Sequence, residues 1–137
     1  MAESIELSTI LPASAERIYL AWLDGEKHSA MTGGDAKVDP APGGSFSAWD
    51  GDIYGKTLEQ EPYRRIVQSW RTTEFPAGSP DSLLEVLLED QDPGQPGKEG
   101  TRIILKHTNI PDGQGQDYYQ GWVDYYFEPM QAYFLEA

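Results

Sequence analysis

The segment from Asp117 to Phe134 repeats large apolar side chains at the period of an α-helix. We call this set the aromatic stripe. Its central members recur every four residues, and others widen the same face: Tyr118, Trp122, Tyr126, Met130 and Phe134, then Tyr119, Tyr125, Pro129 and Tyr133. Burying each large side chain is worth roughly 2–3 kcal/mol, and a whole domain has a net stability of only roughly 5–15 kcal/mol. The stripe must therefore pack against a large apolar surface.

The N-terminal part of the chain predicts one strand and two short helices. Ile5–Ile10 alternates in polarity and predicts a strand, which Pro12 ends. Ser14 is placed as the N-cap of a helix whose apolar residues follow at helical spacing. Asp24-Gly25 interrupts that helix, and a second short helix over Glu26 to Met31 should stop at Gly33-Gly34.

The middle of the chain changes to the period of strands. Asp50-Gly51 is a strong hairpin-turn signal because both positions need a positive φ. Strands are predicted over Ser45–Trp49, Asp52–Glu59, Arg65–Arg71, Leu83–Glu89 and Thr101–Thr108, the last two as a hairpin across the Pro/Gly-rich residues 90–100. Strand and helix do not alternate, so a doubly wound parallel sheet is disfavoured. The order predicts an α+β fold in which a curved antiparallel sheet packs on the final helix.

The final helix is expected from about Gln114 to about Leu135. Pro129 lies inside it and lacks the N–H of a helical residue, which costs about 3 kcal/mol. The stripe around it is worth more, so we expect a kink near Pro129 rather than an end. Gly121 should let the helix approach the sheet closely.

Composition excludes several classes of function. The 137 residues fit one domain, 1–137, and include no cysteine, so disulfides, thiolate metal sites and a cysteine nucleophile are excluded. Ten Lys and Arg oppose 23 Asp and Glu, a net charge of −13, which makes nucleic acid and anionic membranes poor partners. The acidity suits solubility or, alternatively, a docking surface for a basic partner. There is no membrane-spanning run and no signal-like N-terminus, so we expect a cytoplasmic location.

Four segments together resemble a known family. They are PGGSFSAWDGDIYG, RRIVQSWR, GTRIILKHTNIP and YYQGWVDYYFEPMQAYF. In combination they are similar to the C-terminal-type domain of the activator of the ninety-kilodalton heat-shock chaperone's ATPase, over about Ile5 to Leu135. That family belongs to the START-like, birch-pollen-allergen-like superfamily.

The resemblance implies a helix-grip fold: a curved antiparallel sheet wrapped around a long C-terminal helix, with two short helices after the first strand. It implies function less directly. The wider superfamily binds apolar small molecules between sheet and helix, and a minority are cyclases or hydrolases. The eukaryotic activator has a separate N-terminal domain to which nothing here corresponds. A chaperone-modulating role in the stress response is therefore the alternative to ligand binding.

The two histidines have different expected roles. His107 alternates with Ile103 and Leu105 and should face the concave side of the sheet, either as a hydrogen-bonded core residue or as a polar anchor for a ligand. A metal role is disfavoured because no second histidine or cysteine lies at ligand spacing, and we predict neither a metal nor a cofactor. His28 is expected to be exposed. Asp50 and Asp52 fit turn chemistry better than a calcium loop.

The aromatic stripe has two interpretations, a solid core or one wall of an apolar cavity. If there is a cavity, Gln68 and the hydroxyls of Tyr118 and Tyr126 could add polar groups to it, while Trp49 is expected to face outward. The leading hypothesis is a non-catalytic domain that holds an apolar small molecule. Its predicted ligand-binding residues are Phe46, Trp70, Ile103, Leu105, His107, Trp122, Tyr126 and Met130.

Overall fold

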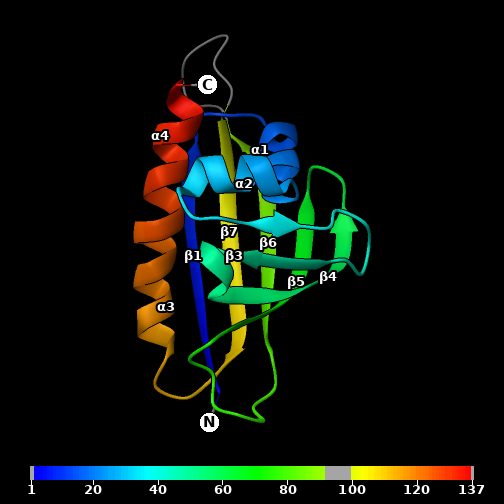
Figure 1. Cartoon of the computed structure of the whole chain (residues 1–137). Helices are drawn as coiled ribbons and strands as arrows, with labels where there is room; N and C mark the ends of the chain where they lie inside the picture. The colour runs from blue at the N-terminus through cyan, green and yellow to red at the C-terminus, as the bar shows by residue number, and fades with distance from the viewer. Residues whose placement is uncertain (1, 92–99, 137) are drawn as a thin grey trace.

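A computed structural model describes residues 2–91 and 100–136. Within them lies an antiparallel sheet of seven strands in the order β1-β7-β6-β5-β4-β3-β2. The strands are β1 (Glu3–Leu11), β2 (Lys37–Val38), β3 (Ser45–Ala48), β4 (Ile53–Glu61), β5 (Arg65–Thr72), β6 (Ser82–Gln91) and β7 (Gly100–Ile110). Figure 1 shows the sheet curving from β1 at one edge to the short strands in front. The α+β class and the antiparallel sheet predicted from the sequence are confirmed.

Two short helices follow β1, and a long one ends the chain. They are α1 (Ala15–Trp22), α2 (Gly25–Thr32) and the C-terminal helix, which comprises α3 (Gly115–Trp122), the π-helical segment η2 (Val123–Phe127) and α4 (Glu128–Glu136). In Figure 1 the C-terminal helix runs alongside β1 and the sheet, while α1 and α2 lie near its α4 end. No helix among the described residues is long and apolar enough to cross a membrane.

The ends of α1 and α2 form where the sequence predicts them. The Ser14 Oγ accepts a hydrogen bond from the Arg17 N–H at 3.2 Å, and the Asp24 Oδ1 accepts one from the Lys27 N–H at 3.1 Å. Each bond satisfies a backbone donor that the first helical turn leaves unpaired. Gly33 ends α2 in the left-handed conformation with φ 89°, which glycine adopts without a steric penalty.

The expected kink takes the form of a widened turn. The Glu128 N–H donates to the Val123 carbonyl, five residues back, and η2 ends at Phe127, two residues before Pro129. A proline ring presses on the carbonyl four residues earlier, here that of Tyr125. Because a π turn changes the spacing at that point, the helix continues through the proline instead of ending.

Four of the five central members of the stripe are buried as predicted and Tyr118 is half-buried, whereas two of the four widening members are exposed. Trp122, Tyr126, Met130 and Phe134 are at most 3% exposed. Tyr119 and Tyr125, expected to widen the buried face, are 40% and 57% exposed. The buried face is thus narrower on the side of Tyr119 and Tyr125 than the sequence pattern indicated.

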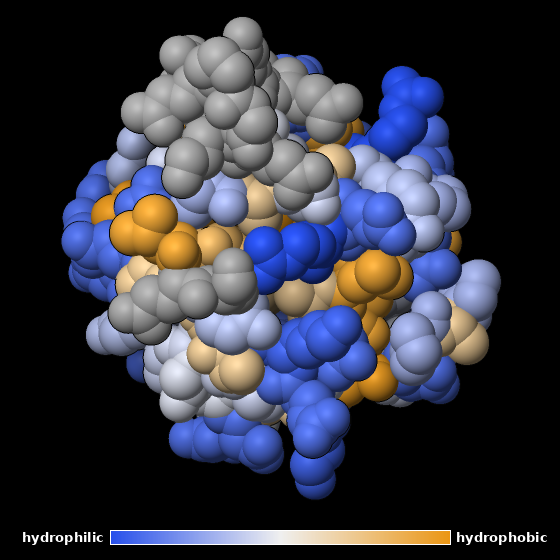
Figure 2. Space-filling model, turned by 90° about the horizontal axis from the view of Figure 1, so that it is seen from above, coloured by the Kyte–Doolittle hydropathy of each residue, from blue (hydrophilic) through white to orange (hydrophobic). Residues whose placement is uncertain are grey.

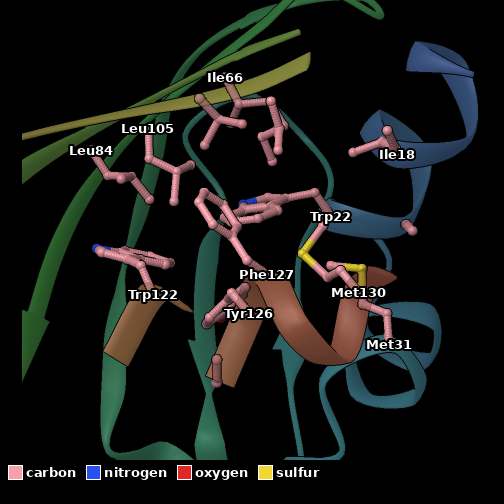
Figure 3. Packing of buried hydrophobic residues seen from close by; sticks show 14 of the residues in the cluster. Ile18, Trp22, Met31, Ile66, Leu84, Leu105, Trp122, Tyr126, Phe127 and Met130 are labelled. Carbon is pink, nitrogen blue, oxygen red and sulfur yellow. The ribbon is translucent and has the colours of Figure 1, made fainter. Parts of the chain in front are cut away.

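Alternate strand residues fill the concave face of the sheet. On β7 these are Ile103, Leu105 and His107, all with no exposed surface. Figure 3 shows Leu84, Leu105 and Ile66 directed from the strands toward Trp122, Trp22 and Phe127. The predicted β6–β7 hairpin is confirmed by pairing from Leu83↔Thr108 to Gln91↔Gly100, and its loop at 92–99 lies outside the described residues.

In the turn between β3 and β4, the two residues predicted to have a positive φ do so, and a third residue has one as well. Asp50 and Gly51 have φ of 60° and 91°, and Trp49 also has a positive φ of 50°. β3 consequently ends at Ala48, one residue earlier than expected. The Asp35 N–H donates to the Asp50 Oδ1 at 3.1 Å, which ties this turn to the segment after α2.

Candidate functional site

A cavity of about 460 Å³ lies between the sheet and the C-terminal helix. Such a volume is in the range of small-molecule sites. The β3–β4 turn and the start of β4 form one side, the end of β5 forms the floor, and α3 with η2 forms the other side. The lining residues are Trp49, Asp52, Ile53, Trp70, Thr72, Glu74, Asp117, Tyr118, Gly121, Trp122, Tyr125 and Tyr126.

Half of the lining residues are aromatic, and they contact one another edge to face or at a tilt. The ring centroids of Trp70 and Trp122 are 5.6 Å apart, and those of Trp122 and Tyr126 are 4.8 Å apart. At the mouth, Trp49 meets Tyr125 edge-on at 5.3 Å. Mutual contacts of this kind stabilise each ring beyond its burial, so the wall has a defined shape before anything binds.

Trp49 borders the cavity and is half-buried, which corrects the expectation that it faces outward. Parity along β3 fails to predict its direction because Trp49 lies in the turn with a positive φ. Its indole ring packs over Gly34, where an added Cβ would lie 2.5 Å from the ring. Glycine at this position is therefore needed for the wall. The Trp49 Nε1 is buried and has no hydrogen-bond partner among the described residues.

Three carboxylates lie at the rim of the cavity. Asp52, Glu74 and Asp117 are all exposed and border the same space. The nearby Tyr118 hydroxyl donates to the Gln114 Oε1 at 2.6 Å and lies 2.9 Å from the Thr72 Oγ1. Burial is the main cause that raises the pKa of Tyr118, and the negative charges of Glu74, Asp52 and Asp117 raise it further. The negative charges of all three carboxylates thus reach the Tyr118 hydroxyl in the cavity.

His107 lies beneath the aromatic wall in a directed chain of hydrogen bonds. The Trp122 Nε1–H donates to the His107 Nδ1 at 3.2 Å, so the proton of a neutral ring is on Nε2. That nitrogen lies 2.8 Å from the Ser82 Oγ, and the Ser82 hydroxyl donates to the Trp70 carbonyl at 2.6 Å. Burial lowers the pKa of His107 to about 3, which keeps the ring neutral. Both ring nitrogens are occupied within the protein.

His28 is buried, with 3% of its surface exposed, which corrects the expected exposure. Its Nδ1 lies 2.9 Å from the Trp22 carbonyl and must donate to it. Its Nε2, 2.8 Å away, therefore accepts from the Tyr126 hydroxyl. Burial lowers the pKa of His28 despite the hydrogen bond to Trp22. The sequence misleads here because α2 packs against the C-terminal helix, a long-range contact that local composition does not show.

The structure brings together part of the predicted ligand-binding set. Trp70, Trp122 and Tyr126 line the cavity, and so does Tyr118, which was expected to supply a hydroxyl. The remaining members lie in the buried core and do not border this cavity: Phe46, Ile103, Leu105, His107 and Met130. Gln68 is also buried elsewhere, where it accepts from the Trp22 Nε1–H at 3.2 Å and donates to the Thr57 Oγ1 at 3.1 Å.

Sequence reasoning missed the helix edge that faces the cavity. Tyr118, Gly121, Trp122 and Tyr125 follow one another at helical spacing, and the small residue Gly121 among three members of the stripe could have indicated where space opens beside the helix. Gly121 does not bring the helix close to the sheet as expected, because an added Cβ would meet only the Tyr125 ring, at 3.8 Å. It instead leaves part of the cavity open. No local signal could have placed Glu74, which lies in a loop.

A second hollow of about 520 Å³ lies beside the α1–α2 junction. Tyr19 is its one aromatic lining residue, and Leu20, Val38 and Gln60 are among the others. It lacks the aromatic wall that a small apolar ligand favours, so the cavity beside the C-terminal helix is the better candidate. Within residues 2–91 and 100–136, no three or more His, Asp or Glu side chains are placed so that they could hold a metal ion together.

Tyr126→Phe should destabilise the protein without closing the cavity. The change leaves the buried His28 Nε2 without its donor, and an unsatisfied buried acceptor costs about 1–3 kcal/mol. Tyr125→Phe is the matched control, because Tyr125 is 57% exposed and should change stability by less than about 0.5 kcal/mol. Urea unfolding of both variants measures the difference. Equal stabilities would show that the His28–Tyr126 hydrogen bond contributes nothing.

A long helix held by a curved antiparallel sheet, with a cavity between them, defines the class of helix-grip proteins. Within that class, the chain belongs to the family of Activator of Hsp90 ATPase homolog 1-like proteins, whose family model matches residues 12–134. The resemblance read from the four sequence segments is therefore confirmed.

Relatives of the chain carry two kinds of name. The human Activator of 90 kDa heat shock protein ATPase homolog 1 is 27% identical over 131 residues, which are 95% of this chain and 36% of that protein. The chain thus spans about a third of the length of the curated relatives it matches, 34% and 36% for the first two.

Among solved structures, an HSP90 activator from Plasmodium falciparum is 23% identical with a TM-score of 0.82 and 94% coverage of both chains. CalU16 from Micromonospora echinospora is 24% identical with a TM-score of 0.77, covering 97% of this chain and 76% of that one. These two structures support the fold alone.

Proposed function

We propose that the protein is a non-catalytic binding domain that holds a small molecule with an apolar body in the cavity beside the C-terminal helix. The observation that carries the proposal is the cavity of about 460 Å³ with six aromatic side chains in its lining. An apolar body that enters it is removed from water over most of its surface, and each Å² of apolar area so buried is worth about 25 cal/mol. A cytoplasmic location suits this role and is part of the proposal.

Two aromatic residues of the cavity wall are held by hydrogen bonds to buried histidines, which a ligand need not break. The Trp122 N–H is bonded to His107, and the Tyr126 hydroxyl lies 2.8 Å from His28. Their rings therefore present apolar faces while their polar atoms are satisfied behind the wall. A site built in this way is organised before binding, which lowers the entropy cost of association. The cavity lining also contains Thr72 and Tyr118, whose hydroxyl oxygens lie 2.9 Å apart.

Gly121→Leu should abolish binding of a neutral naphthalene probe, 1-naphthalenemethanol, while the fold survives. An added Cβ at position 121 would meet only the Tyr125 ring, at 3.8 Å, and Gly121 borders the cavity, so we expect a leucine to extend into that space. Removing a helix-interior glycine should also raise stability by roughly 0.5–1 kcal/mol. The measurement is quenching of tryptophan fluorescence, since three tryptophans line the cavity.

Gly121→Ala is the matched control for this test. It gives the helix the same backbone preference but adds one carbon, so probe binding should be retained. Single-site saturable binding to the native protein and to the alanine variant, lost in the leucine variant, supports the proposal. It would be contradicted by probe affinity that is equal in all three proteins, or by the absence of saturable binding of both neutral and charged naphthalene probes.

A chaperone-modulating interaction is the second candidate function. The human relative is named as an activator of the 90 kDa heat shock protein ATPase, and a net charge of −13 suits contact with a basic surface. Figure 2 shows that hydrophilic residues separate small hydrophobic patches at the end of the molecule where α4 ends. Polar rather than apolar contacts are thus favoured for a partner on the part of that face that the structure describes.

Association with a 90 kDa-class chaperone is expected to be weak and to decrease as salt rises. Exposed charges are screened within about 8 Å at physiological ionic strength. Because the chain spans about a third of its curated relatives, we also expect little stimulation of the chaperone's ATPase. Pull-down and ATPase assays over a salt series measure both. Strong stimulation that salt does not weaken would put this function first, and no association at low salt would remove it.

A further inference from the structure

The charges around the cavity are all of one sign. Of its twelve lining residues, Asp52, Glu74 and Asp117 are acidic, and none is a lysine, arginine or histidine. The ion pairs among the described residues involve Arg65 with Glu59, Glu61 and Glu85, and Arg71 with Asp81. None of the three rim carboxylates takes part in them. The mouth of the cavity therefore carries three carboxylates that have no ion-pair partner among residues 2–91 and 100–136.

The aromatic ring faces below this rim also favour a cationic ligand. An aromatic ring has a negative face, and a cation within about 6 Å of the ring centre is attracted to it, most strongly over tryptophan. Trp49 and Tyr125 meet at the mouth, while Trp70 and Trp122 lie together deeper in the wall. A cationic group between rim and wall would meet carboxylates on one side and ring faces on the other.

We propose that the natural ligand of this cavity is a small organic cation: a flat apolar body that carries an ammonium group at the mouth. The proposal rests on the proposed function, since it names the class of ligand for that site. The apolar body would lie against Trp70, Trp122 and Tyr126, and the ammonium group would lie near Glu74, Asp117 and Asp52. The rim carboxylates repel an anion of the same shape, and a neutral molecule gains no charge attraction from them.

Three probes of one shape separate charge from burial. They are 1-naphthylmethylammonium, 1-naphthalenemethanol and 1-naphthoate, titrated into the full chain at pH 7 and low salt by calorimetry. We expect the ammonium compound to bind about tenfold tighter than the alcohol, from carboxylate attraction and cation–π contact together, and the carboxylate to bind weakest. The preference should shrink as salt rises, because the rim is exposed.

Neutral variants of the rim test which residues cause the preference. The double variant Glu74→Gln and Asp117→Asn should bring the ammonium and alcohol affinities to within about threefold of each other. Glu6→Gln is the matched control, because Glu6 is exposed on β1 and does not border the cavity. It should leave the preference intact.

The outcomes distinguish this inference from the proposed function. Equal affinities for the ammonium compound and the alcohol, both lost in Gly121→Leu, would overturn the cation preference and leave the binding site standing. A preference for naphthoate would overturn it as well, and so would a cation preference that persists unchanged in the double variant. If none of the three probes binds, both proposals fail.

Discussion

Replacing Trp122 with alanine is expected to lower the free energy of unfolding by about 3–5 kcal/mol, the range for large core truncations. Trp122 is 3% exposed. Its ring contacts those of Trp70 and Tyr126, and its Nε1–H donates to His107. The alanine variant loses the buried area, leaves a cavity and leaves a buried histidine nitrogen without its donor. Urea unfolding followed by fluorescence measures the loss.

Two further variants make this test specific. Trp122→Phe keeps most of the apolar volume but removes the donor to His107, and should cost less than the alanine change. Tyr119→Ala is the control, since Tyr119 is a large aromatic residue of the same helix that is 40% exposed. Its effect should fall near the small changes of surface positions. A loss below about 1 kcal/mol for Trp122→Ala would contradict the packing of the stripe on the sheet.

Stability should fall as pH is lowered from about 6.5 toward 5, before most carboxylates titrate. Burial lowers the pKa of His107 to about 3 and also lowers that of His28, whereas an unfolded histidine has a pKa near 6.5. Below about 6.5 the unfolded chain thus binds protons that the folded chain does not. Stability present at neutral pH is therefore lost progressively, by up to about 1.4 kcal/mol per pH unit for each histidine.

Unfolding free energies measured in urea at pH 7, 6, 5.5 and 5 test this expectation. His107→Gln removes one of the two groups, so the slope of stability against pH should fall by up to about 1.4 kcal/mol per pH unit. The slope is compared rather than the stability itself, because the glutamine also changes packing. A native protein equally stable from pH 7 to 5 would show that neither histidine is held neutral by the fold.

The fold could be predicted well because its signals are local. The cap at Ser14, the interruption at Asp24-Gly25, the left-handed Gly33 and the positive φ of Asp50 and Gly51 all follow from side-chain chemistry within a few residues. The stripe predicted both the existence and the length of the C-terminal helix. Exposure of Tyr119 and Tyr125 was not predicted because helical spacing says which residues share a face, and not how wide the opposing surface is.

The site could be predicted only in part because it depends on contacts between distant segments. Strand parity placed Ile103, Leu105 and His107 on the concave face of the sheet, but it does not show where that face is filled by other side chains. Leu105, for example, has no exposed surface and lies where core side chains converge (Figure 3). The open space lies to one side, where the Trp49 turn, the end of β5 and Gly121 meet. A tryptophan placed at Leu105 would overpack the core, whereas a leucine at position 121 reaches the cavity.

The π segment η2 also explains the spacing of the stripe. A regular α-helix advances about 100° per residue, so a repeat of four residues drifts about 40° per step and about 160° from Tyr118 to Phe134. A drift that large would carry the first and last members to nearly opposite sides of the helix. The extra residue held by a π turn removes about 100° of it, which returns the buried members to one face. In this chain, large apolar residues at a strict four-residue period can share one face of the helix only because the helix contains a π turn. Deleting one residue from 123–127 would rotate α4 by about a quarter turn and move Met130 and Phe134 away from the positions they now fill.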